Sequence, residues 1–439
     1  MKARPMQAHH LIGIGFGPSN IALAIALEER GHAARPASSV FIEKQPRFAW
    51  HQDMLLDHAH MQISFLKDLA TLRNPTSRFT FINYLHEKGR LQDFINLKTF
   101  FPSRREFNDY LAWAASKFND RCAYGEEVIE VLPEKRDGDV TLLRVRSRDE
   151  SGAIRERLGH NLVVSIGGTP NIPERFAPWR NDARIFHSSA YLRRIAEHPQ
   201  ARRIAVIGAG QSAAELFMDL HGRSSTTQVD LIMRARSIRP SDDSPFVNEI
   251  FNADFVDHVY HRPHDERGAL LREFWNTNYA CPDLELIENI FKVFYDQKVT
   301  GDARHRFLRR HEVRSVRPAT DGIHLDLFDL NEGRESTACY DVVVLATGYA
   351  REHHKTLLAP IAPYLGDLSV DRNYRVETAP GFRPAIFLQG ACEASHGLSD
   401  TLLSVTSVRT GEIGDALLAA GPAAEPTGKA TNARLAVQA

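Results

Sequence analysis

Three glycines near the start of the chain have the spacing of a phosphate-binding turn. Gly13, Gly15 and Gly17 follow an apolar run over residues 10–14, and a helical apolar pattern over residues 21–27 follows them. In such a strand, turn and helix the glycines let the backbone turn tightly. A pyrophosphate then rests on the amides and the positive dipole of the helix N-terminus. The pattern predicts a dinucleotide site.

An acidic residue strengthens this interpretation. Pro18 takes the place of the usual third glycine, so the spacing alone also fits an ordinary strand-to-helix turn. A second apolar strand, residues 39–43, ends in Glu43, whose carboxylate can accept hydrogen bonds from an adenosine ribose. We also expect Ser19 and Asn20 to cap the helix, since both residue types favour that position. The turn and Glu43 together favour a dinucleotide site.

A second glycine turn lies near the middle of the chain. An apolar strand over residues 203–207 leads into Gly208 and Gly210, and a helical run follows. Ala213 stands at the third position, where alanine is an accepted replacement for the glycine that packs helix on strand. This turn predicts a second dinucleotide site.

The two turns differ in the charge that follows the next strand. Where the first unit has Glu43, the second has Arg234 and Arg236 after the apolar strand 229–233. A cation at this point suits the 2′-phosphate of NADP, whereas an acid suits an unphosphorylated ribose. The sequence therefore predicts FAD at the first turn and NADPH at the second.

Two further segments have ordinary explanations. Residues 44–51 are too irregular for a helix and could cover a flat ligand, although Trp50 alone is more typical of a core anchor. Residues 61–69 fit a short helix or an irregular wall, with Gln62 and Lys67 away from the apolar side. Composition alone places Lys67 on the solvated surface.

The composition is that of an ordinary globular protein. The 439 residues leave room for two or three domains, and 54 basic against 55 acidic residues create no field for nucleic acid or a membrane surface. Four separated cysteines without a CxxC pair fit a reducing compartment and argue against a disulfide scaffold or a zinc site. No apolar run approaches the ~18 residues of a membrane span, and no signal core is present. We expect a cytoplasmic enzyme.

The surrounding elements predict an α/β fold. We expect helices over 80–91, 105–118 and 401–418, and strands over 126–132, 141–146, 162–170, 322–330, 341–349 and 385–389. Residues 244 to about 301 predict a helical insertion, and the Ala/Pro/Gly-rich tail beyond 421 is expected to be disordered. The architecture is two Rossmann-like dinucleotide-binding domains, for FAD and NADPH, with a small helical insertion.

Separated blocks of the sequence then point to one family. The blocks are GFGPSNIALAIAL, MQISFLKDL, NPTS, INYLHEKGRLQDFINL, REFNDYLAWAA, GQSAAE, DDSPFVNEIF, NTNY, LATGY and SHGLSDTLLS. From about residue 10 to about residue 414 the chain resembles the flavin-dependent N-hydroxylating monooxygenases of siderophore biosynthesis. Among these it is most similar to the bacterial L-ornithine N5-monooxygenases.

The resemblance implies three sets of contact residues. The FAD set is Gly13, Gly15, Gly17, Pro18, Glu43, Lys44, Trp50, His51, Gln62, Val128, Thr401, Leu402 and Leu403. The NADPH set is Ala209, Gly210, Gln211, Ser212, Arg234, Asn278, Tyr279 and Ala280. The ornithine set is Lys67, Asn248, Glu249, Ile250, Phe251, Asn278 and Ser404. In this reading Lys67 leaves the surface and becomes the partner of the substrate carboxylate.

The expected domains follow the same order. Residues 1–160 and 349–439 form the FAD domain, residues 161–243 and 308–348 the NADPH domain, and residues 244–307 the substrate-binding insertion. A homo-oligomer, with a tetramer as one form, would fit the family.

The reaction implied by the resemblance needs no protein nucleophile. NADPH reduces FAD, O₂ adds to give a flavin hydroperoxide, and the neutral side-chain amine of L-ornithine attacks it, giving N5-hydroxy-L-ornithine and water. The cofactor carries the chemistry, and Asn278 is expected to position substrate and NADP. No metal is expected.

Other functions stay open at this point. A lysine N6-monooxygenase is the nearest alternative, and a non-catalytic nucleotide-binding redox flavoprotein is a remote one. A flavin disulfide reductase lacks its paired cysteines. A hydrolase built on Ser395, His396 and Asp400 lacks a nucleophile elbow.

Overall fold

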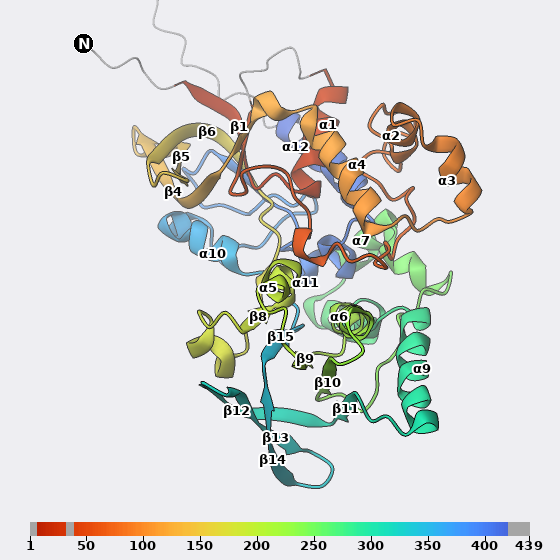
Figure 1. Cartoon of the computed structure of the whole chain (residues 1–439). Helices are drawn as coiled ribbons and strands as arrows, with labels where there is room; N and C mark the ends of the chain where they lie inside the picture. Colours follow the sequence, from red (N-terminus) through yellow and green to blue (C-terminus); the bar gives the residue numbers. More distant parts are fainter. Residues whose placement is uncertain (1–6, 32–38, 420–439) are drawn as a thin grey trace, which may run out of the picture.

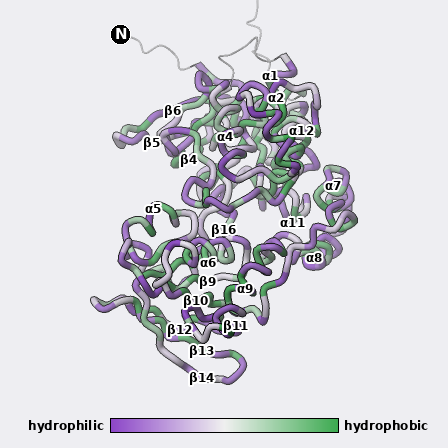
Figure 2. Tube along the Cα trace, turned by 45° about the vertical axis from the view of Figure 1, so that its right-hand side comes forward, coloured by the Kyte–Doolittle hydropathy of each residue, from purple (hydrophilic) through white to green (hydrophobic). Residues whose placement is uncertain are grey.

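The computed structural model describes residues 7–31 and 39–419. The tail beyond residue 421, expected to be disordered, therefore lies outside the described residues. Two halves, each built around one sheet, stand one above the other in Figure 1. Hydrophobic stretches, green in Figure 2, occur inside both halves.

The upper half contains a seven-stranded sheet. Its order is β3-β2-β1-β6-β5-β4, with β17 paired to β6. The strands are β1 (Ala8–Ile14), β2 (Ser39–Glu43), β3 (Cys122–Tyr124), β4 (Glu126–Arg136), β5 (Asp139–Asp149), β6 (Ile154–Val164) and β17 (Ala385–Leu388). Strand β1 runs parallel to β2 and β6, and β17 runs parallel to β6, whereas β5 pairs antiparallel with β6. Ile14 is level with Ile42 and Val164. This register brings the first glycine turn and Glu43 to one carboxyl edge of the sheet.

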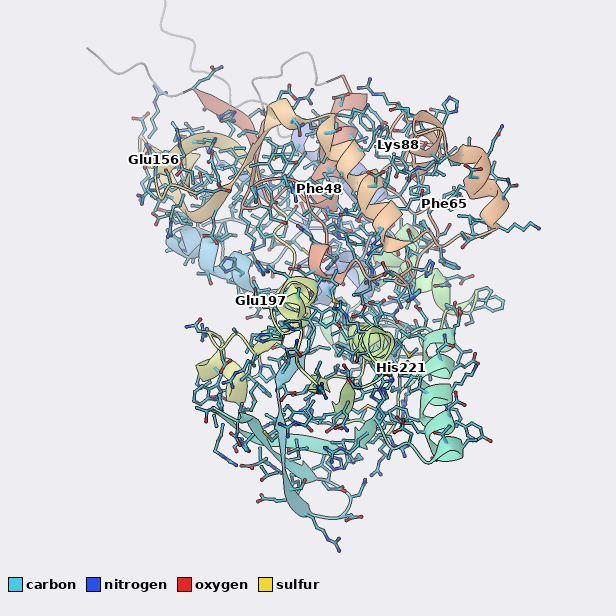
Figure 3. The ribbon with its side chains drawn as sticks, viewed as in Figure 1. Phe48, Phe65, Lys88, Glu156, Glu197 and His221 are labelled. Carbon is cyan, nitrogen blue, oxygen red and sulfur yellow. The ribbon has the colours of Figure 1, made fainter. Side chains whose placement is uncertain are left out.

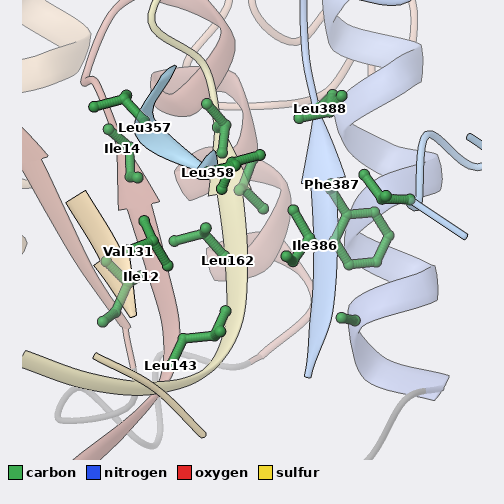
Figure 4. Close-up of a cluster of buried hydrophobic side chains, with 14 of the residues drawn as sticks. Ile12, Ile14, Val131, Leu143, Leu162, Leu357, Leu358, Ile386, Phe387 and Leu388 are labelled. Atoms are coloured by element: carbon green, nitrogen blue, oxygen red, sulfur yellow. The ribbon is translucent and has the colours of Figure 1, made fainter. Parts of the chain in front are cut away.

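The upper half also contains short and long helices. They are α1 (Pro18–Glu29), α2 (Phe81–Glu87), α3 (Leu91–Leu97), α4 (Arg104–Ser116), α10 (His353–Leu357), α11 (Glu393–His396) and α12 (Thr406–Ala419). Helix α1 packs against α12 and α4. Figure 4 shows the core between the strands, where Ile12, Leu162 and Ile386 contribute fully buried side chains.

Two predicted helices differ from the structure. The helix expected over 80–91 ends at Glu87, because Gly89 takes a left-handed φ of 67°, and a second short helix that was not predicted, α3, begins at Leu91. The helix expected from residue 401 begins at Thr406 and follows a 3₁₀ turn, η10 (Leu398–Thr401). The strands expected over 162–170 and 341–349 end at Val164 and Leu345, and only their last residues pair again, in β7 and β16. The remaining predicted strands and helices are present with shifted ends.

The lower half contains a five-stranded parallel sheet. Its order is β11-β10-β9-β15-β8. The strands are β8 (Ile185–His187), β9 (Arg203–Ile207), β10 (Gln228–Met233), β11 (Arg306–Arg309) and β15 (Val342–Leu345), accompanied by helices α5 (Tyr191–Ala196) and α6 (Gln211–Arg223). An antiparallel sheet of β12 (His311–Ala319), β13 (Gly322–Asp329) and β14 (Arg334–Tyr340) lies below it.

The chain passes between the halves twice, and the two passages pair. Strand β7 (Thr169–Pro170) runs antiparallel to β16 (Tyr349–Ala350). The insertion between β10 and β11 contains α7 (Ala253–Tyr260), α8 (His264–Glu273), α9 (Leu284–Thr300) and the 3₁₀ turns η7 (Val247–Phe251) and η8 (Trp275–Thr277). Further 3₁₀ turns are η3 (Gln52–Met54), η4 (Asn119–Arg121), η5 (Glu174–Trp179), η6 (Ser188–Ala190) and η9 (Ala359–Tyr364). In the described residues no helix is both long and apolar enough to cross a membrane.

The fold class expected from the sequence is confirmed. The parallel strands of both halves carry a glycine turn followed by a helix, as in Rossmann-like nucleotide-binding units, and a helical insertion follows β10.

Candidate active site

The first glycine turn lies at the carboxyl edge of the upper sheet. Gly15 has a φ of 81°, and a Cβ there would stand 2.5 Å from the carbonyl oxygen of Ser165, so only glycine fits. Gly17 is the N-cap of α1, has no side-chain cap, and a Cβ on it would meet nothing within 4 Å. An uncapped helix N-terminus beside open space is the arrangement that receives a phosphate.

Ser19 and Asn20 do not cap α1, contrary to expectation. Asn20 is fully buried, and its Nδ2 donates to the carbonyl oxygens of Ile14 (3.3 Å) and Gly15 (2.7 Å). Its Oδ1 accepts from Ser165 and Gln389, which lie at the ends of β6 and β17. Asn20 therefore stabilises the turn from the core side. Its side chain does not face the ligand side, where a helix cap would lie.

Arg409 reaches the same helix end from α12. It is buried, its Nη2 donates to Ser19 Oγ (3.0 Å), and its Nη1 contacts the Asp400 carboxylate (3.0 Å). No sequence motif marked Arg409, because its partners lie far away in the chain.

Glu43 holds the position expected of a ribose ligand. Its buried carboxylate accepts from the amides of Phe16 (2.8 Å) and Gln45 (2.9 Å), one on each oxygen. A carboxylate oxygen has room for a second donor, so both oxygens remain able to accept from ribose hydroxyls. Lys44 beside it is exposed.

Trp50 and His51 form an aromatic wall after β2. The Trp50 ring packs 6.0 Å from that of Phe107 and 4.8 Å from that of His51. His51 has a left-handed φ of 49°. The His51 side chain keeps solvent contact, but the protein atoms packed around it desolvate the ring. This desolvation, with the charges of Arg104 and Arg351 near it, lowers the pKa of His51 to about 4. His51 is therefore neutral at physiological pH.

The second glycine turn is closed by the insertion. Gly208 has a φ of 154° and stands too close to the Ala346 carbonyl for any side chain. A Cβ on Gly210 would lie 3.5 Å from Cα of Ala280, and α6 begins at Gln211 without a side-chain cap. Residues 209–212 and 278–280, both in the predicted NADPH set, are therefore neighbours. Ser212 and Asn278 are half-buried.

Tyr279 links this loop to the upper half. Its hydroxyl donates to the Glu393 carboxylate, and its ring lies 4.3 Å from that of Trp275. Burial, with Glu393 beside it, raises the pKa of Tyr279 to about 12, and burial raises the pKa of Glu393.

Arg234 and Arg236 are exposed directly after β10. In the described part of the chain neither guanidinium forms an ion pair. They follow the strand after the second glycine turn, where a 2′-phosphate would need a cation.

Two polar connections join the halves beside the glycine turns. Arg104 of α4 forms a bidentate ion pair with Glu215 of α6, at 2.9 and 2.7 Å, and both side chains are largely buried. Asp283 accepts from Gln62 (2.8 Å) and from Gln211 (2.9 Å). Gln62 of the FAD set and Gln211 of the NADPH set thus share one carboxylate. No local sequence pattern marked Asp283, Glu215 or Arg104 as site residues.

Lys67 is not the surface residue that composition indicated. It is half-buried, and burial lowers the pKa of its ammonium group. The neighbouring carboxylate of Asp68 accepts from the amides of Ala70, Thr71 and Phe81. Lys67 forms no ion pair with any described residue, which leaves its charge for a ligand. Phe65, on the same segment, packs in the upper half (Figure 3).

The remaining predicted substrate residues come from two segments that meet. Ile250 of η7 and Leu398 of η10 line one small apolar cavity together with Phe255 and Val259. Asn248 is half-buried, its Nδ2 donates to the Asp243 carbonyl (2.7 Å), and Glu249 is exposed. Phe251 is half-buried.

The segment after η10 carries Ser404. Its side chain is 2% exposed, and its Oγ has no hydrogen-bond partner among the described residues. A buried hydroxyl without a partner is a place where a ligand group can bind. Leu403 packs against the aromatic core around Phe81, whereas Val128 of β4 lies in the core of the sheet. Thr401 and Leu402 are half-buried.

The possible hydrolase residues do not form a triad. His396 is fully buried, stacks 4.0 Å from the ring of Tyr374, and burial lowers its pKa to about 4. Its Nδ1 contacts Ser395, but its Nε2 faces the carbonyl of Arg372, and Asp400 is paired with Arg409. Asp400 therefore does not orient His396, as the carboxylate of a catalytic triad would.

One cluster outside these sites has metal-binding residue types. Single ligand atoms of Asp321, His324 and Cys339 lie within 4.8 Å of one another. The Arg203 guanidinium lies 3.7 Å from Cys339 Sγ, and His324 already contacts the Asp321 carboxylate (3.0 Å). A cation at the thiol disfavours a metal, and these contacts already satisfy the polar groups of the cluster as hydrogen bonds. All four cysteines are free.

Comparisons with known proteins agree with this arrangement. The sequence model of a family described as L-lysine 6-monooxygenase/L-ornithine 5-monooxygenase matches residues 7–351. The chain is 51% identical over 413 residues to an L-ornithine N(5)-monooxygenase of Pseudomonas aeruginosa, and the match covers 93% of both chains.

Solved structures are also similar. The ornithine hydroxylase PvdA from Pseudomonas aeruginosa superposes with a TM-score of 0.91 and 50% identity, over 94% of this chain and all of that one. An ornithine N-hydroxylase of Kutzneria sp. 744, described with reduced FAD, NADP⁺ and L-ornithine, has a TM-score of 0.89 and 38% identity, over 94% and 99% of the two chains.

Proposed function

The chain belongs to the L-lysine 6-monooxygenase/L-ornithine 5-monooxygenase family, and from this premise we propose that it hydroxylates the side-chain amine of L-ornithine. The product is N5-hydroxy-L-ornithine, an intermediate for hydroxamate siderophores. FAD and NADPH are its cofactors, and O₂ is the second substrate. Since the family includes lysine enzymes, the choice of ornithine is supported by the ornithine enzymes at 51% and 38% identity.

Bound FAD supplies the chemistry, by taking electrons from NADPH and activating oxygen. The protein residues bind and orient. The open N-terminus of α1 at Gly17 would receive the FAD pyrophosphate, and the buried Glu43 would accept from its ribose. Trp50 and the neutral His51 would border the flavin ring without adding a charge.

The second glycine turn fits NADPH. The N-terminus of α6 beside Ala280 would hold the pyrophosphate, and Arg234 would pair with the 2′-phosphate. The Tyr279–Glu393 contact holds the loop that contains Asn278 against the upper half.

A half-buried lysine without a counter-ion is the observation that supports an amino-acid substrate. The Lys67 ammonium would bind the ornithine carboxylate, and the unpaired Ser404 hydroxyl and the amides of Asn248 and Asn278 would orient the substrate. Amides fix polar groups without adding charge, so the substrate amine can lose its proton and act as a nucleophile.

We propose the same domain division as the sequence suggests, with FAD bound by residues 1–160 and 349–439 and NADPH by residues 161–243 and 308–348. Residues 244–307 would complete the substrate site. We place the enzyme in the cytoplasm, where NADPH is available, and the free cysteines are consistent with this.

A second copy of the chain would pack on α9. Leu284, Phe291, Tyr295 and Val299 are each more than half exposed, and their spacing places them on one stripe of the helix. If two α9 helices pair antiparallel about their midpoint, Leu284 meets Val299 and the acidic N-terminal turn meets the basic C-terminal turn. This complementarity supports a homo-oligomer.

The test of the substrate is a product assay with purified enzyme, FAD and NADPH over ornithine, lysine, putrescine and arginine. Hydroxylated ornithine should dominate. NADPH oxidation without any hydroxylated amine would favour a redox flavoprotein instead.

A further inference from the structure

Asp283 lies where three parts of the chain meet. Its Oδ1 accepts from Gln62 Nε2 of the upper half at 2.8 Å. Its Oδ2 accepts from Gln211 Nε2, on the first residue of α6, at 2.9 Å. Its own backbone amide donates to Gln211 Oε1 at 3.0 Å. One residue of the insertion thus connects the flavin side with the second glycine turn.

The Asp283 carboxylate does not cap the helix that it precedes. Asp283 is the N-cap of α9, where an aspartate normally accepts from amides of its own helix. No such cap is formed, and both oxygens face the two glutamines instead. The contacts with Gln62 and Gln211 therefore replace the helix cap that an aspartate at this position would normally form.

The carboxylate also fixes which way each glutamine points. A carboxylate only accepts hydrogen bonds, so both glutamines must turn their NH₂ groups toward it. Gln211 is bound at both ends, since its Nε2 also donates to Glu215 (2.9 Å). Gln62 Oε1 is left as an acceptor directed away from Asp283.

We propose that Asp283 is a positioning residue that keeps Gln62 Oε1 available to accept a hydrogen bond from the carboxamide NH₂ of the bound nicotinamide. This rests on the proposed function. A dinucleotide held at α6 must extend its nicotinamide to the flavin to pass a hydride, and the family resemblance assigns Gln62 to the flavin side of that route.

Asp283→Asn tests the polarity without removing the bonds. Asparagine offers one acceptor and one donor, so one glutamine must rotate. Gln211 is held by Glu215 and by the backbone amide of residue 283, so Gln62 rotates and presents NH₂ where its oxygen was. The nicotinamide then faces a donor instead of an acceptor.

Binding to the oxidised holoenzyme is measured by titration calorimetry with NADP⁺ and with 2′,5′-ADP, which lacks the nicotinamide. We expect Asp283→Asn to weaken NADP⁺ about tenfold and to leave 2′,5′-ADP unchanged. The melting temperature should stay near that of the wild type. Asp254→Asn, at a carboxylate in the first turn of α7, is the matched control.

A second substitution should restore binding. In the Asp283→Asn background, Gln62→Glu gives an oxygen toward the asparagine NH₂ and another toward the ligand, at unchanged net charge. NADP⁺ affinity should recover in this double variant. In the wild-type background Gln62→Glu faces Asp283 with a like charge and should weaken NADP⁺ binding.

Unchanged NADP⁺ affinity in Asp283→Asn, equal loss for both ligands, or no recovery in the double variant would overturn the positioning role. If the wild type binds neither NADP⁺ nor 2′,5′-ADP, the proposed NADPH site itself is wrong. The two failures are thereby distinguished.

Discussion

Replacing Lys67 by methionine removes a half-buried charge while keeping most of the apolar stem. The ammonium has no counter-ion among the described residues, and the Asp68 carboxylate next to it is occupied by backbone amides. We therefore expect the charge to be satisfied by the substrate carboxylate. A hydrogen bond to a charged group contributes ~1.5–3 kcal/mol, which corresponds to a ~10- to 150-fold rise in the KM for ornithine.

The stability of the variant separates this role from a structural one. Burial lowers the pKa of Lys67 in the folded protein, so the folded chain holds the proton less tightly than the unfolded chain. The charge thus costs stability at neutral pH. This cost begins to fall as the pH rises through the folded pKa and is gone above the higher pKa of the unfolded chain. Lys67→Met should therefore melt no lower than the wild type at pH 7.

The assay combines steady-state kinetics, flavin content and calorimetric melting. We expect normal FAD content, normal NADP⁺ affinity and a high KM for ornithine. Because the pKa of Lys67 is lowered, the KM of the wild type for ornithine should begin to rise at a lower pH than the ordinary pKa of lysine. The KM of the variant should not show this rise. An unchanged KM in a folded, FAD-loaded variant would refute the carboxylate anchor.

Three other changes test separate parts of the account. Arg234→Ala should raise the NADPH KM ~10- to 100-fold and leave that for NADH unchanged, and Arg236→Ala serves as a comparison; equal use of both nucleotides by the wild type would contradict the assignment. Glu215→Gln leaves the buried Arg104 without its charge partner and should lower the free energy of unfolding by ~3–5 kcal/mol, measured by denaturant titration. A loss below about 1 kcal/mol would show that this ion pair contributes little to the stability of the protein. Phe291→Glu should shift the assembly to a smaller species in light scattering at micromolar concentration, and an unchanged mass would exclude α9 as the interface.

The two nucleotide-binding turns were predictable because their signals are local. Apolar strand, glycines and helical periodicity lie within about twenty residues, and the parallel register of β1 and β2 then brings Glu43 to the turn. The insertion and most strands follow from periodicity in the same way. Lys67 needed the family resemblance, since no local pattern distinguishes a half-buried lysine from an exposed one.

The remaining errors and omissions come from tertiary contacts. Asn20 fits a cap by residue type, but its partners Ser165 and Gln389 come from distant strands. Asp283 also fits a cap, yet its carboxylate binds two glutamines of other segments. The partner of such a side chain depends on which distant segments of the chain come together in the fold. Local patterns in a single sequence do not show this.

The most direct test of the central claim is the amount of hydroxylated amine formed per NADPH oxidised, with ornithine and lysine at equal concentration. With the carboxylate held by Lys67, one extra methylene displaces the lysine amine and should lower efficiency ~10- to 200-fold. Ornithine should give nearly one hydroxyornithine per NADPH, whereas lysine should give mainly hydrogen peroxide. More hydroxylysine than hydroxyornithine would contradict the account.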